Sequence, residues 1–142
     1  MKRGKDEFLT KLNLQTTGAE VANELRGKSW EERYQWINQA KEKGNKMVKE
    51  DKIEAAIDEY MRALCGMDFS SYSIKEDNGE QKERDTRVKR ELKAPILNNI
   101  ALCLIKQGKI QRANTMLDLV LEADPTNNKA WQRKIQNLIS LA

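Results

Sequence analysis

A pattern of small and apolar residues occurs twice in this chain, and it constrains the fold more than any other feature. Gly44 and Ala56 lie twelve residues apart, and Ala101 and Ala113 repeat that spacing 57 residues later. Further members of the pattern follow each pair at helical spacing: Tyr60, Ala63, Leu117, Val120 and Pro125. Small residues at such positions allow two antiparallel helices to approach closely. The sequence therefore predicts two copies of a helix-turn-helix unit.

The doubled pattern resembles the tetratricopeptide repeat, a unit of about 34 residues that stacks on its neighbours. The resemblance implies an all-α fold: an array of about two and a half repeats in a right-handed superhelix. Such arrays bind other molecules through side chains on their concave face. We expect the repeat domain to span 29–142, after a partly helical or flexible N-terminal arm at 1–28.

Capping residues and periodicity predict the helices of repeat one, at 37–65. Ser29 with Glu32 matches the capping box that opens a helix, here from Trp30 to about Glu50, and Thr17 with Glu20 matches the same motif. A second helix is expected over 52–64. Its inward side chains are predicted to be Ile53, Ala56, Ile57, Tyr60, Ala63 and Leu64.

Residues 66–84 are rich in turn formers and charges, and we expect an inserted loop there. Repeat two is expected at 85–125, with helices from Asp85 to Gln107 and over 109–123, and a third repeat begins with a helix at 127–141. Pro95 lacks a backbone donor, so either a kink or the true helix start lies near Lys93.

The last expected helix has no partner helix in the sequence, although it is rich in apolar residues. These are Trp131, Ile135, Leu138, Ile139 and Leu141. Either the sequence is a fragment or something covers this face. The candidates are the arm with Phe8, Leu9 and Leu12, a helix absent from the sequence, or a second copy of the chain; the homodimer is the preferred hypothesis.

Composition disfavours several classes of protein. Charged residues make up 34% of the 142 residues, mean hydropathy is −0.81, and no stretch is long and apolar enough for a membrane span or signal peptide. The net charge is +4, but the 22 acidic and 26 basic residues are intermixed, so nucleic acid is not an expected partner. Cys65 and Cys103 are expected to be buried thiols, which suits a cytoplasmic or nuclear protein.

Enzymatic function is not expected either. The chain has no His, which removes the commonest general base and metal ligand. The two cysteines are not spaced as a metal or redox pair, and no Gly-rich phosphate loop is present. We therefore expect no cofactor, no metal site and no catalytic residue.

Repeat geometry places five polar residues on the inner wall of the array. They are Lys41 and Asn45 in the first unit, Asn99 in the second, and Lys129 and Arg133 in the third. Residues four apart project from one face of a helix, so we expect Lys41 to lie beside Asn45 and Lys129 to lie beside Arg133. Three cations and two amides converging on a groove can hold two carboxylates. A C-terminal peptide ending in Asp presents both carboxylates on one residue.

Three segments carry a closer resemblance: residues 40–45 (AKEKGN), 97–103 (LNNIALC) and 128–133 (NKAWQR). They are similar to the carboxylate clamp of tetratricopeptide co-chaperones, which bind the Glu-Glu-Val-Asp tails of cytosolic heat-shock chaperones of the 90 and 70 kilodalton classes. The insert and Pro95 look most like immunophilin-type members, including aryl-hydrocarbon-receptor-interacting proteins. The resemblance implies that the five residues form this clamp. The alternative is a structural scaffold that packs a partner helix or self-associates without clamp activity.

Overall fold

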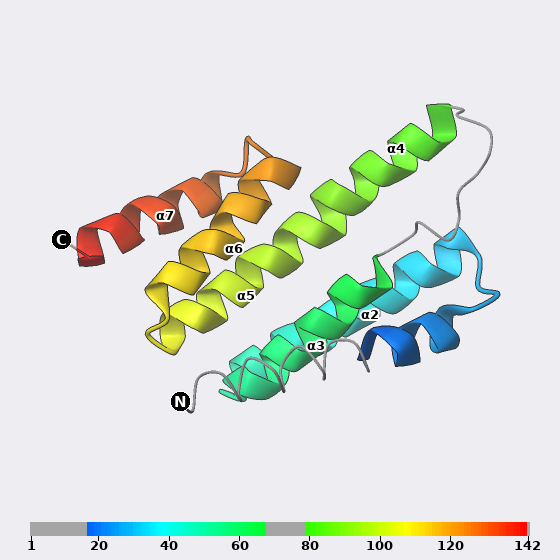
Figure 1. Cartoon of the computed structure of the whole chain (residues 1–142), viewed down its shortest axis with the longest axis horizontal. Coiled ribbons are helices and arrows are strands. Elements are labelled where there is room, and N and C mark those ends of the chain that lie inside the picture. Colours follow the sequence, from blue (N-terminus) through cyan, green and yellow to red (C-terminus); the bar gives the residue numbers. More distant parts are fainter. Residues whose placement is uncertain (1–16, 68–78, 142) are drawn as a thin grey trace.

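The computed structural model describes residues 17–67 and 79–141, and the regular structure within these ranges is entirely helical (Figure 1). A helix over residues 17–25 comes first. The others are α2 (Trp30–Lys49), α3 (Ile53–Gly66), α4 (Gly79–Val88), the π-helical turn η2 (Lys89–Lys93), α5 (Ala94–Lys106), α6 (Ile110–Ala123) and α7 (Asn128–Leu141). The predicted all-α fold class is confirmed.

The start of α2 is fixed by the capping box that the sequence predicts. The backbone N–H of Glu32 donates to Ser29 Oγ at 3.2 Å, and this hydroxyl donates to Glu32 Oε1 at 3.2 Å. The first bond satisfies a backbone N–H that a helix start leaves without an intrahelical partner, and the second joins the two side chains of the capping box. The residues before Thr17 lie outside the described ranges, so a cap at Thr17 and Glu20 stays a prediction.

The helices of each pair approach closely where the sequence has small residues. A Cβ atom on Gly44 would lie only 2.4 Å from Cε1 of Tyr60, so the tyrosine ring occupies the space that a side chain would need. Ala56 and Ala63 of α3 are fully buried, as are Ala101 of α5 and Ala113 of α6. Both predicted helix pairs are therefore present.

The helix that contains Pro95 differs from the expectation. It begins at Gly79 rather than near Asp85, so the C-terminal part of the predicted loop at 66–84 is helical; residues 68–78 lie outside the described ranges. Near Lys93 the chain neither begins a helix nor breaks one. It widens into η2, where the N–H of Ala94 bonds to the carbonyl of Lys89. The wider turn accommodates a proline ring that would clash with the preceding turn of a regular α-helix.

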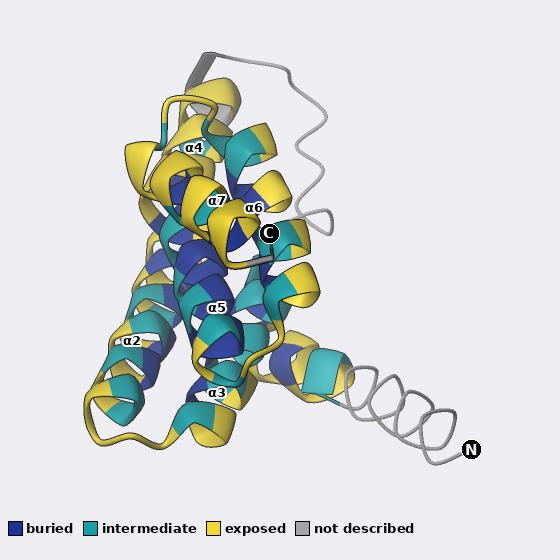
Figure 2. Ribbon diagram, turned by 90° about the vertical axis from the view of Figure 1, so that its left-hand side faces the viewer, coloured by how far each residue is buried: buried dark blue, intermediate teal, exposed yellow. Residues whose placement is uncertain are grey.

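α5 lies at the centre of the molecule and is the most buried helix in Figure 2. It packs against α3 on one side and α6 on the other, and α7 packs on α6. The helix at 17–25 lies at the opposite end of the array, where Val21 and Leu25 are buried. There Glu24 accepts hydrogen bonds from Trp36 Nε1 at 3.0 Å and Arg62 Nη2 at 2.8 Å. This part of the arm therefore covers the α2–α3 end and leaves α7 uncovered.

Both cysteines are free thiols, and the predicted burial is confirmed for Cys103 but not for Cys65. Cys103 is buried and Cys65 is half-buried. Burial raises the pKa of both thiols, which keeps them protonated and poorly reactive at neutral pH. None of the described helices combines the length and the hydropathy that a bilayer span requires.

The contacts at Ala56 and Ala113 lead to a stability prediction. Replacing either residue by Leu should lower the free energy of unfolding by about 1–3 kcal/mol, because neither site has room for a larger side chain. The exposed Ala55 of α3 provides a matched control, since Ala55→Leu adds the same atoms in water. Denaturant unfolding measures all three. Equal stabilities of Ala56→Leu and Ala55→Leu would contradict the helix pairing.

Candidate functional site

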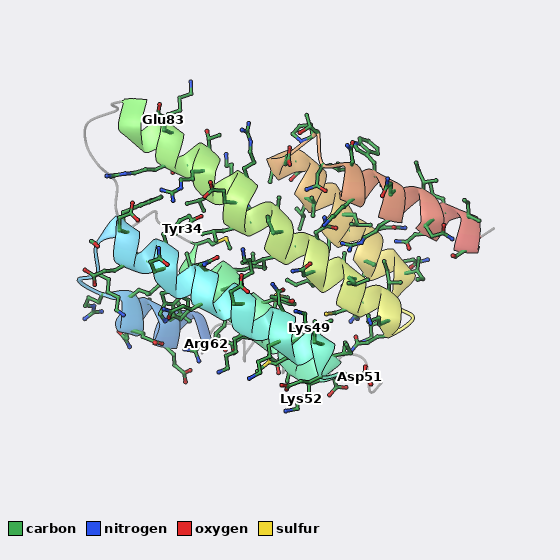
Figure 3. All side chains as sticks on the ribbon, turned by 180° about the vertical axis from the view of Figure 1, so that it is seen from behind. Tyr34, Lys49, Asp51, Lys52, Arg62 and Glu83 are labelled. Atoms are coloured by element: carbon green, nitrogen blue, oxygen red, sulfur yellow. The ribbon has the colours of Figure 1, made fainter. Side chains whose placement is uncertain are left out.

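Three helices supply the five predicted site residues. Lys41 and Asn45 lie on α2, Asn99 on α5, and Lys129 and Arg133 on α7. Figure 3 shows α2, the continuous α4–α5 helix and α7 following one another across the molecule. The five residues differ in the number of hydrogen bonds that they form with other helices.

Asn45 and Asn99 are in direct contact. Asn99 Nδ2 donates to Asn45 Oδ1 at 2.8 Å, and the hydroxyl of Tyr60 donates to the same oxygen at 2.6 Å. Both asparagines are half-buried, whereas Tyr60 is fully buried beneath them. The two amides thus form one polar cluster between α2 and α5.

Arg133 is tied to the residue beside Asn99. Its Nη1 atom donates to the backbone carbonyl of Asn98 at 3.1 Å and to Asn98 Oδ1 at 2.5 Å. Asn98 is itself only 4% exposed and donates to Asn127 Oδ1 at 3.2 Å; this oxygen also caps α7 by accepting from the N–H of Ala130 at 3.0 Å. Burial lowers the pKa of Arg133, but a guanidinium stays charged at neutral pH.

The two lysines are less constrained than the arginine. Lys41 Nζ lies 3.9 Å from Glu42 Oε1, and its side chain is 18% exposed. Lys129 is exposed and forms no ion pair with any residue that the structure describes. Neither lysine forms a hydrogen bond or ion pair with Asn45, Asn99 or Arg133 in the described ranges. Of the two lysines, only Lys129 is exposed and has no ion pair among the described residues; the ammonium group of Lys41 lies beside Glu42.

A brace between α2 and η2 lies next to Lys41. Tyr34, in the space between these helices in Figure 3, donates a short hydrogen bond to Glu91, and Arg87 Nε donates to the same carboxylate at 3.0 Å. These hydrogen bonds, that of Tyr34 first, hold the pKa of Glu91 below its usual value, and the charge of Lys41 adds a smaller effect. Tyr34 and Arg87 thus stabilise the charged form of Glu91 by direct hydrogen bonds, and Lys41 contributes least.

The five predicted site residues carry functional groups that could bind an anion. They offer ammonium, guanidinium and amide donors, and the described ranges hold no group of three or more His, Cys, Asp or Glu residues suited to a metal ion. Charge-assisted hydrogen bonds from such groups suit carboxylates.

Sequence reasoning missed three residues that support the site: Tyr60, Asn98 and Asn127. Tyr60 was assigned to the core, and its ring is indeed buried, but its hydroxyl contacts Asn45. Asn98 is a polar residue inside the apolar run of α5, which could have signalled a buried hydrogen-bonding role. Asn127 was placed in the last helix, whereas it caps that helix from outside.

Models of known protein families give no match to the sequence, and neither do curated proteins. The structure is similar to the C-terminal TPR-containing domain of a Plasmodium falciparum FK506-binding protein. The TM-score is 0.61 and the identity 24%, and the match covers 78% of this chain and 68% of that one. At this identity the likeness concerns the fold. The chain therefore has the fold of a tetratricopeptide repeat domain.

Proposed function

We propose that the chain is a co-chaperone adaptor that binds the acidic C-terminal Glu-Glu-Val-Asp tail of a cytosolic heat-shock chaperone. The clamp would consist of Lys41, Asn45, Asn99, Lys129 and Arg133. The observation that carries the proposal is the pair of links across helices, Asn99 to Asn45 and Arg133 to Asn98, which gathers donors from three helices. A cytoplasmic setting, with the nucleus as an alternative, goes with this partner.

A terminal Asp fits the division of charge in the site. Lys41 with the amide pair can hold one carboxylate, and Lys129 with Arg133 can hold the other. Each carboxylate would then meet at least one cation, which offsets the cost of taking it out of water. A peptide with an amidated C-terminus loses one of these negative charges. Its terminal NH2 group is a hydrogen-bond donor and would face the donors of the clamp.

Peptide binding tests the proposal directly. A peptide ending in Glu-Glu-Val-Asp should bind with a free energy of about −7 to −8 kcal/mol, in the micromolar range, and its amidated form should not bind. Isothermal titration calorimetry measures both. Equal affinities for the two peptides would refute the clamp. The affinity should also fall with added salt, because ions screen the exposed part of the attraction.

Lys129 offers the cleanest mutational test. Lys129→Ala should weaken peptide binding by about 1.5–3 kcal/mol and leave stability unchanged, because Lys129 is exposed and has no ion pair among the described residues. Arg112→Ala removes the same charge from an exposed site on α6 and serves as the control. If the two variants bind the peptide equally well, Lys129 is not a clamp residue.

Arg133 calls for a different substitution. Arg133→Ala would remove the donor to Asn98 Oδ1 and should also lower stability by about 1–2 kcal/mol, so a loss of binding would be ambiguous. Arg133→Lys keeps the charge and loses the planar guanidinium fork. We expect this variant to fold and to bind the peptide about tenfold more weakly. Unchanged affinity, measured by the same calorimetry, would show that only the charge at this position matters.

A second candidate function is self-association through α7, and the exposure of its outer side favours it. Trp131 is 47% exposed, Ile135 55%, Leu138 59% and Ile139 63%. Soluble monomers seldom leave large contiguous apolar patches in water. The arm residues Phe8, Leu9 and Leu12 and the side chain of Leu141 lie outside the described ranges. In this reading the α7 surfaces of two copies pair about a two-fold axis.

The dimer has its own test. Ile135→Glu with Leu138→Glu should convert a dimer into a monomer in sedimentation experiments, because a dimer interface would bury two unpaired charges per copy. Gln132→Glu with Gln136→Glu adds the same charge at exposed polar sites of α7 and should leave the dimer intact. A monomeric unmodified chain at high micromolar concentration would rule the dimer out. The peptide affinity of the Ile135→Glu, Leu138→Glu variant should not change, since Lys129 and Arg133 project from another side of α7.

A further inference from the structure

The amide of Asn45 can serve a carboxylate ligand in only one of its two orientations. A half-turn of the side-chain amide exchanges Oδ1 and Nδ2, and so replaces a donor by an acceptor that repels the ligand. In the structure Oδ1 takes the hydrogen bonds from Tyr60 and Asn99, and the NH2 group makes none within the described ranges. That NH2 group is therefore the part left for a ligand.

Asn99 cannot fix this orientation by itself. Two neighbouring amides can form a hydrogen bond in either direction if both turn together, so the bond from Asn99 to Asn45 has a mirror alternative. In that alternative Asn45 would donate to Asn99 and present its carbonyl to the groove. A third group is needed to select one direction.

Tyr60 supplies that group. Its hydroxyl donates to Asn45 Oδ1 at 2.6 Å, and the side chain is only 1% exposed, so water cannot readily replace the acceptor. Burial, the largest effect, raises the pKa of Tyr60 to about 12, which keeps the hydroxyl protonated throughout the neutral range. The ring occupies the space that a side chain on Gly44, one residue before Asn45, would need.

We propose that Tyr60 is a positioning residue of the carboxylate site: its hydroxyl holds the Asn45 amide with NH2 toward the ligand. This inference rests on the proposed function and adds to it a specificity determinant in the second helix of the first pair. Tyr60 acts through Asn45 and does not touch the ligand. The effect of Tyr60 on peptide affinity should therefore disappear when the side-chain amide of Asn45 is removed.

A double-mutant cycle tests this dependence. Tyr60→Phe keeps the ring, so it should fold, and it should bind the free-acid peptide about two- to tenfold more weakly as the reversed amide orientation becomes populated. In an Asn45→Ala background the same substitution should have no further effect. Thr115→Val, which removes an exposed hydroxyl on α6 that donates to the backbone carbonyl of Gln111, is the control and should bind as the unmodified chain does.

Each outcome has one reading. Equal additive losses in both backgrounds, or no loss in Tyr60→Phe, would overturn the positioning role while leaving peptide binding in place. Equal binding of free-acid and amidated peptides by the unmodified chain would remove the proposed function and this inference with it. If Tyr60→Phe fails to fold, NMR of the unmodified chain decides. The Asn45 side-chain amide signals must then shift with the free-acid peptide and stay unshifted with the amidated one, and any other result overturns the proposal.

Discussion

The contact between Gly44 and Tyr60 is the constraint on which the first helix pair and the candidate site both depend. A side chain at Gly44 would collide with the tyrosine ring, since its Cβ would lie 2.4 Å from Cε1. Without one, α2 and α3 approach until the ring is enclosed, and the hydroxyl emerges beside Asn45. Close packing in the interior thereby places a hydrogen-bond donor against Asn45 of the candidate site. One glycine thus affects both the packing of the helix pair and the geometry of the candidate site.

Local rules account for the parts of the fold that the sequence predicts well. The capping box at Ser29 and Glu32 fixes the start of α2, and the spacing of small residues identifies both helix pairs, because each signal acts within a few turns of helix. Residues 79–84 gave no such signal. Their side chains are polar throughout, and they are helical as an extension of the turns anchored by the buried Val88 and Leu92. The π-helical turn before Pro95 likewise depends on both of its flanks being packed.

In the candidate site too, the sequence predicts local features but not contacts between helices. Helical spacing predicts that Lys129 and Arg133 share a side of one helix, but it does not predict that Arg133 meets Asn98 from another helix. Such bonds depend on how far α5 and α7 lie from each other, which no local pattern encodes. Tyr60 shows the same limit: its burial follows from periodicity, whereas the contact of its hydroxyl follows only from three helices placed together.

Asn127 gives α7 an unusual dependence on its neighbour. The oxygen that caps the first turn of α7 also accepts a hydrogen bond from Asn98 of α5, and Asn98 in turn holds Arg133. The beginning of α7 and the placement of its cation therefore form one cooperative unit. A ligand that fixed Arg133 in place would also reduce fraying at the start of α7. Conversely, fraying of the first turn of α7 would free the guanidinium of Arg133 from Asn98. A ligand that bound Arg133 would therefore change the hydrogen-exchange protection of the first turn of α7, the turn that also carries the exposed Trp131.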